Sequence, residues 1–500
     1  MPVEHFDVVI MGAGLSGIGA GYRLQTRCPS KKYVILEGRS EIGGTWDLFR
    51  YPGVRSDSDM FTLGYSFRPW KEARAIADGP SILKYVRDTA REYGIDRHIR
   101  FQQRVRSASW SSDEGRWLVE VECGHGGTAQ YSCEFLYGCT GYYRYDSGYE
   151  PEFPGAKSFR GRLVHPQHWP EDLDYSGKKV VVIGSGATAV TLVPAMSERA
   201  AHVTMLQRSP SYVLTLPTHD AAADVLRKYL PIDLAHRAVR WKNILVSIGI
   251  YQLARRTPDF TRGLLRKAAI QSLPEGYEVD KHFKPRYKPW DQRLCLVPDA
   301  DLFRSIREGR ASVVTDEIET LTERGIRLKS GEHLDADIIV SATGLQMLAL
   351  GGVGLVVDGA KVNVGKCFVY KGTMVSNVPN FAFCVGYTNA SWTLRADLAS
   401  TFVCRVLNYM DRRGYHLCRP MCDPESLEMK PLLSLNSGYV LRAAANLPKQ
   451  GGKEPWLIKQ NYILDMLTMK FGRLKDGVLK FERAVGKPRK RVIEKLEPVA

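Results

Sequence analysis

Two glycine-rich loops, far apart in the chain, constrain its fold more than any other feature. The first loop reads Gly12-Ala13-Gly14-Leu15-Ser16-Gly17 and follows the apolar run 6–11. The second reads Gly184-Ser185-Gly186-Ala187-Thr188-Ala189 and follows the apolar run 180–183. A strand, a glycine turn and a helix in this order open a dinucleotide-binding unit, because the helix N-terminus can receive a pyrophosphate. Two such loops predict two bound dinucleotides and a redox reaction that passes between them.

The first loop has the features of a flavin site. Gly12 and Gly14 allow a tight turn and a close approach to the pyrophosphate, and Gly17 allows the helix to pack on the strand. Glu37 follows Gly17 by twenty residues and ends the apolar run YVIL, where a carboxylate can accept hydrogen bonds from a ribose. The position of this unit near the N-terminus favours FAD, by analogy with other flavoproteins.

The second loop has the features of a nicotinamide site that prefers NADPH. Ala189 replaces the third glycine and still permits close packing of helix on strand. After the next strand, HVTML, the chain continues Gln207-Arg208-Ser209 and carries no acid. An acid at this place would bind a ribose 2′-hydroxyl and repel a 2′-phosphate, whereas Arg208 can pair with the phosphate.

The order of strands and helices predicts an α/β fold with two Rossmann-like dinucleotide-binding domains. We expect the FAD-binding domain to comprise residues 1–145 and 345–500, and the NADP-binding domain, residues 146–344, to be inserted into it. Residues 212–290 have few β-branched runs and many Ala, Leu, Arg and Lys, which predicts a helical insertion. The basic run 486–491, GKPRKR, is expected to be a solvated C-terminal tail.

Composition narrows the partners. Ten cysteines without regular pairing predict a reduced, cytoplasmic protein, and no apolar run is long enough to cross a bilayer. The net charge of +16 favours anionic partners. No nucleic-acid-binding signature accompanies it, so we expect no nucleic acid, and we expect no metal site. The stretch 241–256, WKNILVSIGIYQLARR, allows two interpretations: a helix packed on the core with basic ends, or a contact with an anionic membrane surface.

A linker motif between the loops adds a family resemblance. It reads Phe159-x-Gly161-x-x-x-His165-x-x-x-Trp169-Pro170, and further matching segments are 43–60, 180–195, 205–210, 290–298 and 386–394. With these segments the chain resembles type I Baeyer–Villiger monooxygenases, which carry FAD and use NADPH, and most closely their ethionamide-activating group. His165 and Trp169 are expected to order the linker between the domains.

The resemblance implies a set of site residues. It places Arg293 over the flavin, with Asp57 as the carboxylate beside it, as the catalytic pair. The implied FAD contacts beyond the glycines are Ser16, Glu37, Thr45, Trp46, Asp47 and Val105. The implied NADP contacts are Arg55, Gly184, Ser185, Gly186, Ala187, Thr188, Ala189, Val190, Gln207 and Arg208. Gln292 stands where many family members have a lysine near the 2′-phosphate, which leaves more of the phosphate recognition to Arg208.

The reaction that the resemblance implies is monooxygenation through a peroxyflavin: one atom of dioxygen is inserted into a ketone to give an ester or lactone, or is transferred to sulfur. Three alternatives remain. A flavin-containing or N-hydroxylating monooxygenase would act on amines or sulfides. A pyridine-nucleotide disulfide reductase would need a cysteine pair near the flavin, and no close pair follows the first loop. A non-enzymatic flavin-binding scaffold would bind FAD without consuming NADPH.

Overall fold

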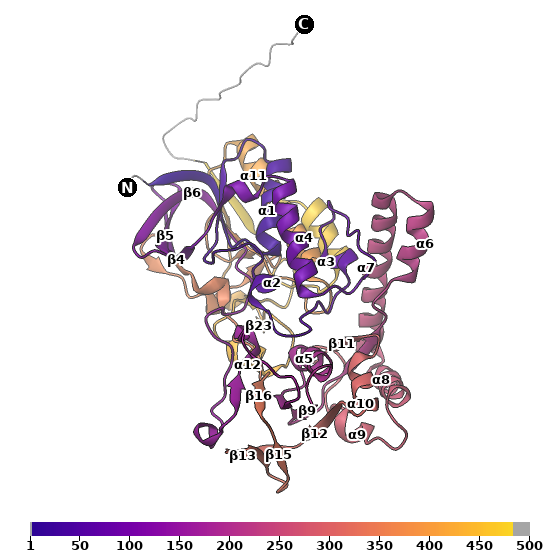
Figure 1. Cartoon of the computed structure of the whole chain (residues 1–500). Helices are drawn as coiled ribbons and strands as arrows, with labels where there is room; N and C mark the ends of the chain where they lie inside the picture. The colour runs from indigo at the N-terminus through magenta and orange to yellow at the C-terminus, as the bar shows by residue number, and fades with distance from the viewer. Residues whose placement is uncertain (1–2, 484–500) are drawn as a thin grey trace.

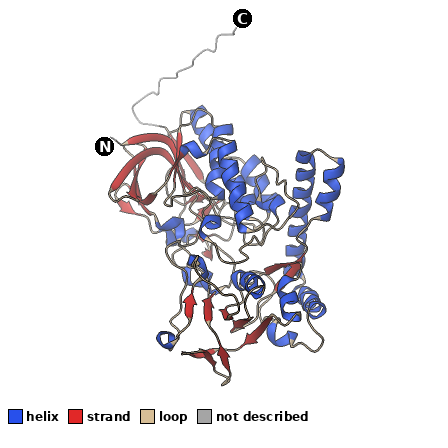
Figure 2. Ribbon diagram, in the orientation of Figure 1, coloured by secondary structure: helices blue, strands red, loops and turns tan. Residues whose placement is uncertain are grey.

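The computed structural model describes residues 3–483, which form two large, separate β-sheets and several small ones, with helices packed around them (Figure 1; Figure 2). The predicted basic tail at 486–491 lies outside the described residues. Within the described part of the chain, no helix has the length and apolar character needed to cross a bilayer.

The first sheet collects strands from the beginning of the chain and from a region more than 200 residues later. At its centre β1 pairs in parallel with β2 and with β6, and β21 pairs in parallel with the end of β6. Strand β5 lies antiparallel between β4 and β6. The strands of this sheet are β1 (Glu4–Met11), β2 (Tyr33–Leu36), β3 (Ile99–Arg100), β4 (Gln103–Ser111), β5 (Arg116–Cys123), β6 (Thr128–Gly138), β17 (Gly354–Val357), β18 (Ala360–Lys361), β19 (Val369–Tyr370), β20 (Met374–Val375) and β21 (Phe381–Phe383).

The second sheet is entirely parallel. Its strand order is β12-β9-β8-β16-β7, with bounds β7 (Arg162–Val164), β8 (Lys179–Ile183), β9 (His202–Gln207), β12 (Ala311–Thr315) and β16 (Ile338–Ser341). A small antiparallel sheet, β13 (Ile318–Thr322), β14 (Gly325–Leu328) and β15 (His333–Asp335), lies beside it. All strands of the second sheet fall between two parts of the first sheet in sequence, as an inserted unit requires. The boundaries at 145 and 344 stay a prediction that this strand order supports.

Two connecting segments join the sheets, and they run side by side. One leads from β6 to β7, and the other leads back from β16 to β17. Their backbones pair antiparallel at Tyr143 and Met347. Arg144 N–H donates to the Gln346 carbonyl at 2.8 Å, and Leu348 N–H donates to the Tyr142 carbonyl at 2.9 Å. The chain therefore enters and leaves the second unit through one hydrogen-bonded ribbon.

The helices divide between the two units and a projecting insertion. The helices of the first unit are α1 (Leu15–Arg27), α2 (Thr45–Leu48), α3 (Met60–Leu63), α4 (Gly79–Glu92), α11 (Trp392–Arg413), α12 (Gly438–Ala443) and α13 (Tyr462–Met466). The second unit has α5 (Ala187–Ser197) and α10 (Asp301–Arg307). The predicted helical insertion contains α6 (Ala221–Tyr229), α7 (Ile232–Arg256), α8 (Pro258–Ser272) and α9 (Val279–His282), between the paired strands β10 (Val213–Leu216) and β11 (Cys295–Pro298). In Figure 1, α6 and α7 stand away from the sheets.

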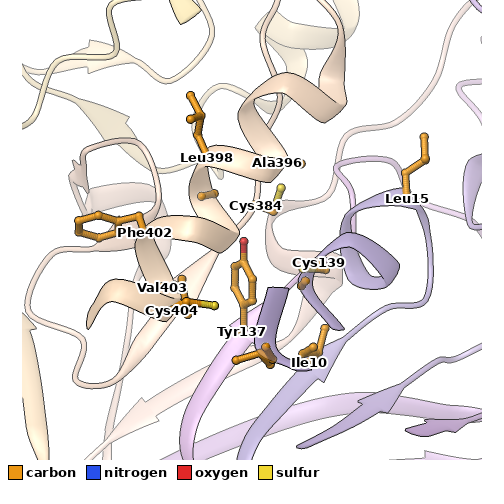
Figure 3. Packing of buried hydrophobic residues seen from close by; sticks show 14 of the residues in the cluster. Ile10, Leu15, Tyr137, Cys139, Cys384, Ala396, Leu398, Phe402, Val403 and Cys404 are labelled. Atoms are coloured by element: carbon orange, nitrogen blue, oxygen red, sulfur yellow. The ribbon is translucent and has the colours of Figure 1, made fainter. Parts of the chain in front are cut away.

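The main core of the first unit is assembled from both of its chain segments. Ile10 and Tyr137 from the central strands pack with Cys384 and with Phe402 of α11, as Figure 3 shows. The Tyr137 hydroxyl lies 3.1 Å from the Ser400 hydroxyl of α11, so the buried phenol is satisfied. The helix α11 also packs on α1, the helix that begins at the first glycine loop. The second chain segment of this unit therefore supports the position of that loop. The remaining short strand pairs are β22 (Leu417–Pro420) with β25 (Leu479–Glu482) and β23 (Lys430–Pro431) with β24 (Lys449–Gln450).

Candidate functional site

One cavity of about 1220 Å³ lies between the carboxyl ends of the two sheets. Both glycine loops line it, the first through Gly12, Gly14 and Ser16, and the second through Gly184 to Thr188. Carboxyl ends of parallel strands are where open α/β sheets bind their ligands. The two loops predicted from sequence therefore face one shared space.

The first loop is an uncapped helix start. The helix α1 begins after Gly14, without a side-chain cap and without an acid in its first turn. Gly12 has a φ of +101°, and a Cβ there would lie 2.7 Å from the Cys139 carbonyl oxygen. A Cβ on Gly17 would lie 1.8 Å from the Gly12 carbonyl oxygen. Glycine is thus required at both positions, and the free amides and the positive end of the helix dipole fit a pyrophosphate.

Glu37 lies at the end of β2 beside this loop. One carboxylate oxygen accepts from the Ala13 N–H at 2.6 Å, and the other accepts from the Arg39 N–H at 2.9 Å. Burial raises the pKa of Glu37, while the two backbone donors act in the opposite direction. The two hydrogen bonds hold the loop against the end of the strand. Because the side chain also lines the cavity, its remaining oxygen lone pairs can accept hydrogen bonds from a ribose.

Of the other predicted FAD contacts, four line the cavity and one is buried behind it. Thr45, Trp46, Val105 and Ser16 line the cavity. Ser16 also accepts a hydrogen bond of 2.8 Å from the Trp392 indole N–H. Asp47 lies behind the wall, almost fully buried, and pairs with Arg39 and with Arg87 at 3.1 Å.

The second loop, like the first, leads into a helix that begins after a glycine. The helix α5 begins after Gly186 with no side-chain cap and no acid in its first turn. Gly184 has a φ of +133°, and a Cβ at Gly186 would meet nothing within 4 Å, which leaves open space in front of the loop. Ala187 and Thr188 line the cavity, whereas Ala189 and Val190 are buried in the core behind it. Any contact from these last two residues to a ligand would have to come from their backbone.

Gln207, the last residue of β9, and Arg208, which follows it, differ in their surroundings. Arg208 is exposed at the cavity edge and, among the described residues, forms no ion pair within bonding distance. Gln207 is buried, and its amide nitrogen donates to the His282 carbonyl at 2.8 Å and to the Thr315 hydroxyl at 2.9 Å. Its amide donor is therefore committed to the fold, and Arg208 is the group available to an incoming phosphate.

Arg55 also lines the cavity. Its guanidinium pairs with Asp301 at the start of α10, with a second contact at 3.3 Å. This ion pair links a loop of the first unit to a helix of the second. It therefore holds the Arg55 guanidinium at the cavity.

Arg293 and Asp57 both line the cavity and form an ion pair there. The Arg293 Nη2 lies 2.6 Å from an Asp57 carboxylate oxygen, although the two residues are 236 positions apart in the chain. The side chains are 37% and 28% exposed, because both face the open cavity. Asp57 raises the pKa of Arg293 well above its usual value. The site thus holds a permanent positive charge whose direction is set by a carboxylate.

Three tyrosines surround this pair, and the sequence did not predict them as site residues. Tyr142, Tyr143 and Tyr439 line the cavity and interact electrostatically with the Arg293 guanidinium. The Tyr143 hydroxyl donates to the Tyr142 hydroxyl at 3.0 Å, and burial raises the pKa of Tyr439 to about 12. Burial also raises the pKa of Tyr143, so the phenols of Tyr143 and Tyr439 stay protonated near neutral pH. They come from the connecting ribbon and from α12, segments without any recognisable motif.

His165 of the linker motif orders the connection between the units, as expected. Its Nε2 lies 3.2 Å from the Gly344 carbonyl oxygen, and its Nδ1 accepts from the Gln167 N–H at 3.2 Å. Trp169 packs against the core of the second unit. Among residues 3–483 we find no group of three or more His, Cys, Asp or Glu side chains placed to hold a metal ion.

The amino-acid sequence is similar to those of flavin-dependent monooxygenases. The model of the flavin-binding monooxygenase-like family matches residues 65–227, and that of the NAD(P)-binding Rossmann-like domain matches residues 10–78. The chain is 55% identical over 481 residues to the FAD-containing monooxygenase EthA of Mycolicibacterium smegmatis, covering 96% of this chain and 98% of that relative. It is 50% identical to the probable FAD-binding monooxygenase AlmA of Acinetobacter baylyi, covering 96% and 97%.

Comparison with solved structures concerns the fold. An oxidized steroid monooxygenase bound to NADP superposes with a TM-score of 0.76 at 22% identity, covering 96% of this chain and all of that one. Cyclohexanone monooxygenase from Rhodococcus bound to NADP⁺ superposes with a TM-score of 0.75 at 19% identity, covering 97% and 100%. The predicted α/β fold with two Rossmann-like units is confirmed by these matches.

Proposed function

The chain belongs to the family of FAD-containing, flavin-binding monooxygenases, and from this premise we propose that its substrates are ketones and sulfur compounds. As a member it is an NADPH-dependent enzyme that combines FAD, dioxygen and a small organic molecule. We propose Baeyer–Villiger oxidation of ketones to esters or lactones as the main reaction. Oxygenation of thioethers or thioamides is the second.

The observation that carries this proposal is the Arg293–Asp57 pair in a cavity that both nucleotide loops share. FAD, when bound, would supply the oxygen-transfer chemistry with electrons from NADPH. The residues of the chain would do the rest: the first loop and Glu37 hold the flavin nucleotide, and the second loop with Arg208 holds NADPH. Arg293 supplies a fixed positive charge where negative charge develops in the reaction, and Asp57 keeps the guanidinium in place.

The experiment that tests the proposal is mass spectrometry of the products formed with NADPH and isotopically labelled dioxygen. A panel of linear, cyclic and aryl ketones and matched thioethers serves as substrate. We expect one labelled oxygen atom in an ester or lactone from ketones, and one in a sulfoxide from thioethers. Label that appears only in hydroxylated amines, with ketones and thioethers untouched, would replace the proposal by the N-hydroxylating alternative.

The nucleotide preference gives a prediction for Arg208. Arg208→Ala should raise the Michaelis constant for NADPH on the order of tenfold or more and change that for NADH little, because only NADPH carries the 2′-phosphate that a charge-assisted bond would hold. Steady-state kinetics with both nucleotides measures the difference. Arg324→Ala, an exposed arginine of the same unit outside the cavity, is the control. Equal changes for both nucleotides would assign phosphate recognition to another group, with the surroundings of Gln292 as the next place to test.

The cellular setting is also part of the proposal. We propose that the protein is cytoplasmic and associates peripherally with an anionic membrane surface. The net charge of +16 supports this, because anionic lipid attracts basic protein surfaces.

A further inference from the structure

Large apolar side chains are exposed in unusual density on the helical insertion. Of the exposed large apolar residues among the described residues, more than half lie between residues 216 and 270. They are Leu216, Val225, Tyr229, Leu230, Ile232, Leu234, Trp241, Leu245, Val246, Ile250, Leu253, Phe260, Leu264 and Ile270. We call these fourteen side chains the insertion surface. Exposed apolar side chains gathered on one part of a protein mark a site of interaction with another apolar phase or molecule.

The helix α7 shows how this surface arises. Its inner side is fixed to the first unit: the Arg240 guanidinium donates to the carbonyls of Phe61 at 2.6 Å and Gly64 at 2.9 Å. The Asn243 amide donates to Asp59 at 2.9 Å. Leu245 and Leu253, on the outer side, are 54% and 46% exposed. The sequence stretch 241–256 is therefore a helix with one side packed on the core, as the first interpretation has it, while a contact of its uncovered side with a membrane stays a prediction.

Basic residues accompany the apolar ones. Residues 221–272 contain ten Lys and Arg against three Asp and Glu, and no acid occurs from residue 234 to residue 258. Lys228, Arg237, Arg256 and Lys267 are exposed, and none of them forms an ion pair with any residue of the described part of the chain. Their charge is available to an external anion.

We infer that the insertion surface docks on an anionic lipid bilayer. A helix with apolar side chains on one side and unpaired basic residues beside them lies in the membrane interface, where it buries the apolar groups and meets the anionic headgroups. Tyr229, 80% exposed, and Trp241 have the amphipathic rings that favour the headgroup level. The surface continues onto the C-terminal segment through the contact of Trp241 with Tyr462, beyond which Leu464, Leu467 and Phe471 are also exposed.

The same charge disfavours a second copy of the chain as the occupant. A two-fold dimer brings one surface against itself, so the unpaired basic residues of both copies would face one another. Such like-charge contacts oppose association, whereas an anionic lipid surface neutralises them. The inference concerns where the protein resides and does not depend on the substrate class proposed above.

Vesicle flotation of the full-length, FAD-loaded protein tests the inference. The vesicles are phosphatidylcholine alone, or equal parts phosphatidylcholine and phosphatidylglycerol, at low and at high salt. We expect flotation with the anionic vesicles at low salt and less at high salt, because salt screens the electrostatic part. The variant Leu245→Glu/Leu253→Glu should lose on the order of tenfold in binding or more, because both side chains leave the interface and two negative charges enter it.

The matched control is Met421→Glu/Met429→Glu, which alters two methionines outside the insertion that are 44% and 53% exposed. It should float like the unmodified protein, and both double variants should retain FAD absorbance and melting temperature. Two results would overturn the inference. One is equal flotation of the two double variants. The other is an insertion variant that changes the molecular mass in solution from dimer to monomer while the unmodified protein never floats with lipid.

Discussion

Arg293→Ala is expected to abolish formation of oxygenated product while leaving a folded protein that binds FAD. Removing one fixed donor from the place where charge develops typically lowers a rate on the order of a hundredfold to a thousandfold. Arg293 is the cation that Asp57 positions in the shared cavity, so the substitution removes the fixed positive charge at that place. NADPH oxidation should continue slowly and yield hydrogen peroxide. Product analysis by mass spectrometry, with a peroxide assay beside it, measures both fates of the electrons.

Two further variants define what the arginine does. Arg293→Lys keeps the charge and should restore little activity, because an ammonium cannot reproduce the planar fork held by Asp57. Arg266→Ala breaks an ion pair of equal length, 2.6 Å to Asp280, on the surface of the insertion, and should leave activity unchanged. An Arg293→Ala enzyme that still makes ester at the unmodified rate would show that the Arg293–Asp57 pair is structural.

Gly17→Ala is expected to have the second large effect, on flavin binding. The added methyl group would lie 1.8 Å from the Gly12 carbonyl oxygen, so the loop backbone or α1 must move. Forcing extra atoms into a packed site costs about 1–3 kcal/mol or more, and every 1.4 kcal/mol is tenfold in binding. The fraction of protein that retains FAD after gel filtration, read from its visible absorbance, should fall steeply, and the melting temperature should fall with it.

Gly263→Ala is the control for this substitution. Gly263 lies within α8, and a Cβ there would meet nothing within 4 Å. Alanine favours helix over glycine by about 1 kcal/mol, so stability should stay equal or rise and FAD content should not change. If Gly17→Ala retains FAD as well as Gly263→Ala does, the close contact at the first loop is not needed for flavin binding.

The nucleotide loops could be predicted from sequence because their chemistry is local. Gly12, Gly17 and Glu37 fall within one strand–turn–helix–strand unit, and their spacing fixes their relative positions. The same holds for Arg208, at the end of a single strand. Sequence spacing alone could not bring Asp57 and Arg293 together; the family resemblance did, and the structure has them 2.6 Å apart.

The residues that sequence missed depend on long-range packing. Tyr439 reaches the site because α12 returns to it from a segment without periodic pattern, and Trp392 reaches Ser16 because α11 packs on α1. Gln207, which the family resemblance assigned to the nucleotide, lines the cavity, and its amide nitrogen donates to the His282 carbonyl and the Thr315 hydroxyl. Hydrogen-bond partners 75 and 108 positions away leave no trace in a single sequence.

The paired ribbon between the two units has a consequence for protein engineering. The chain enters and leaves the second unit at neighbouring points, close to where Tyr143 pairs with Met347. The two ends of the second unit are therefore adjacent. Domains whose ends are close together can be exchanged between hosts without stretching the chain. The nicotinamide-binding unit is thus suited to domain exchange. We expect the equivalent segment of a relative, joined at the two paired connecting segments, to bring its own nucleotide preference to this flavin-binding unit.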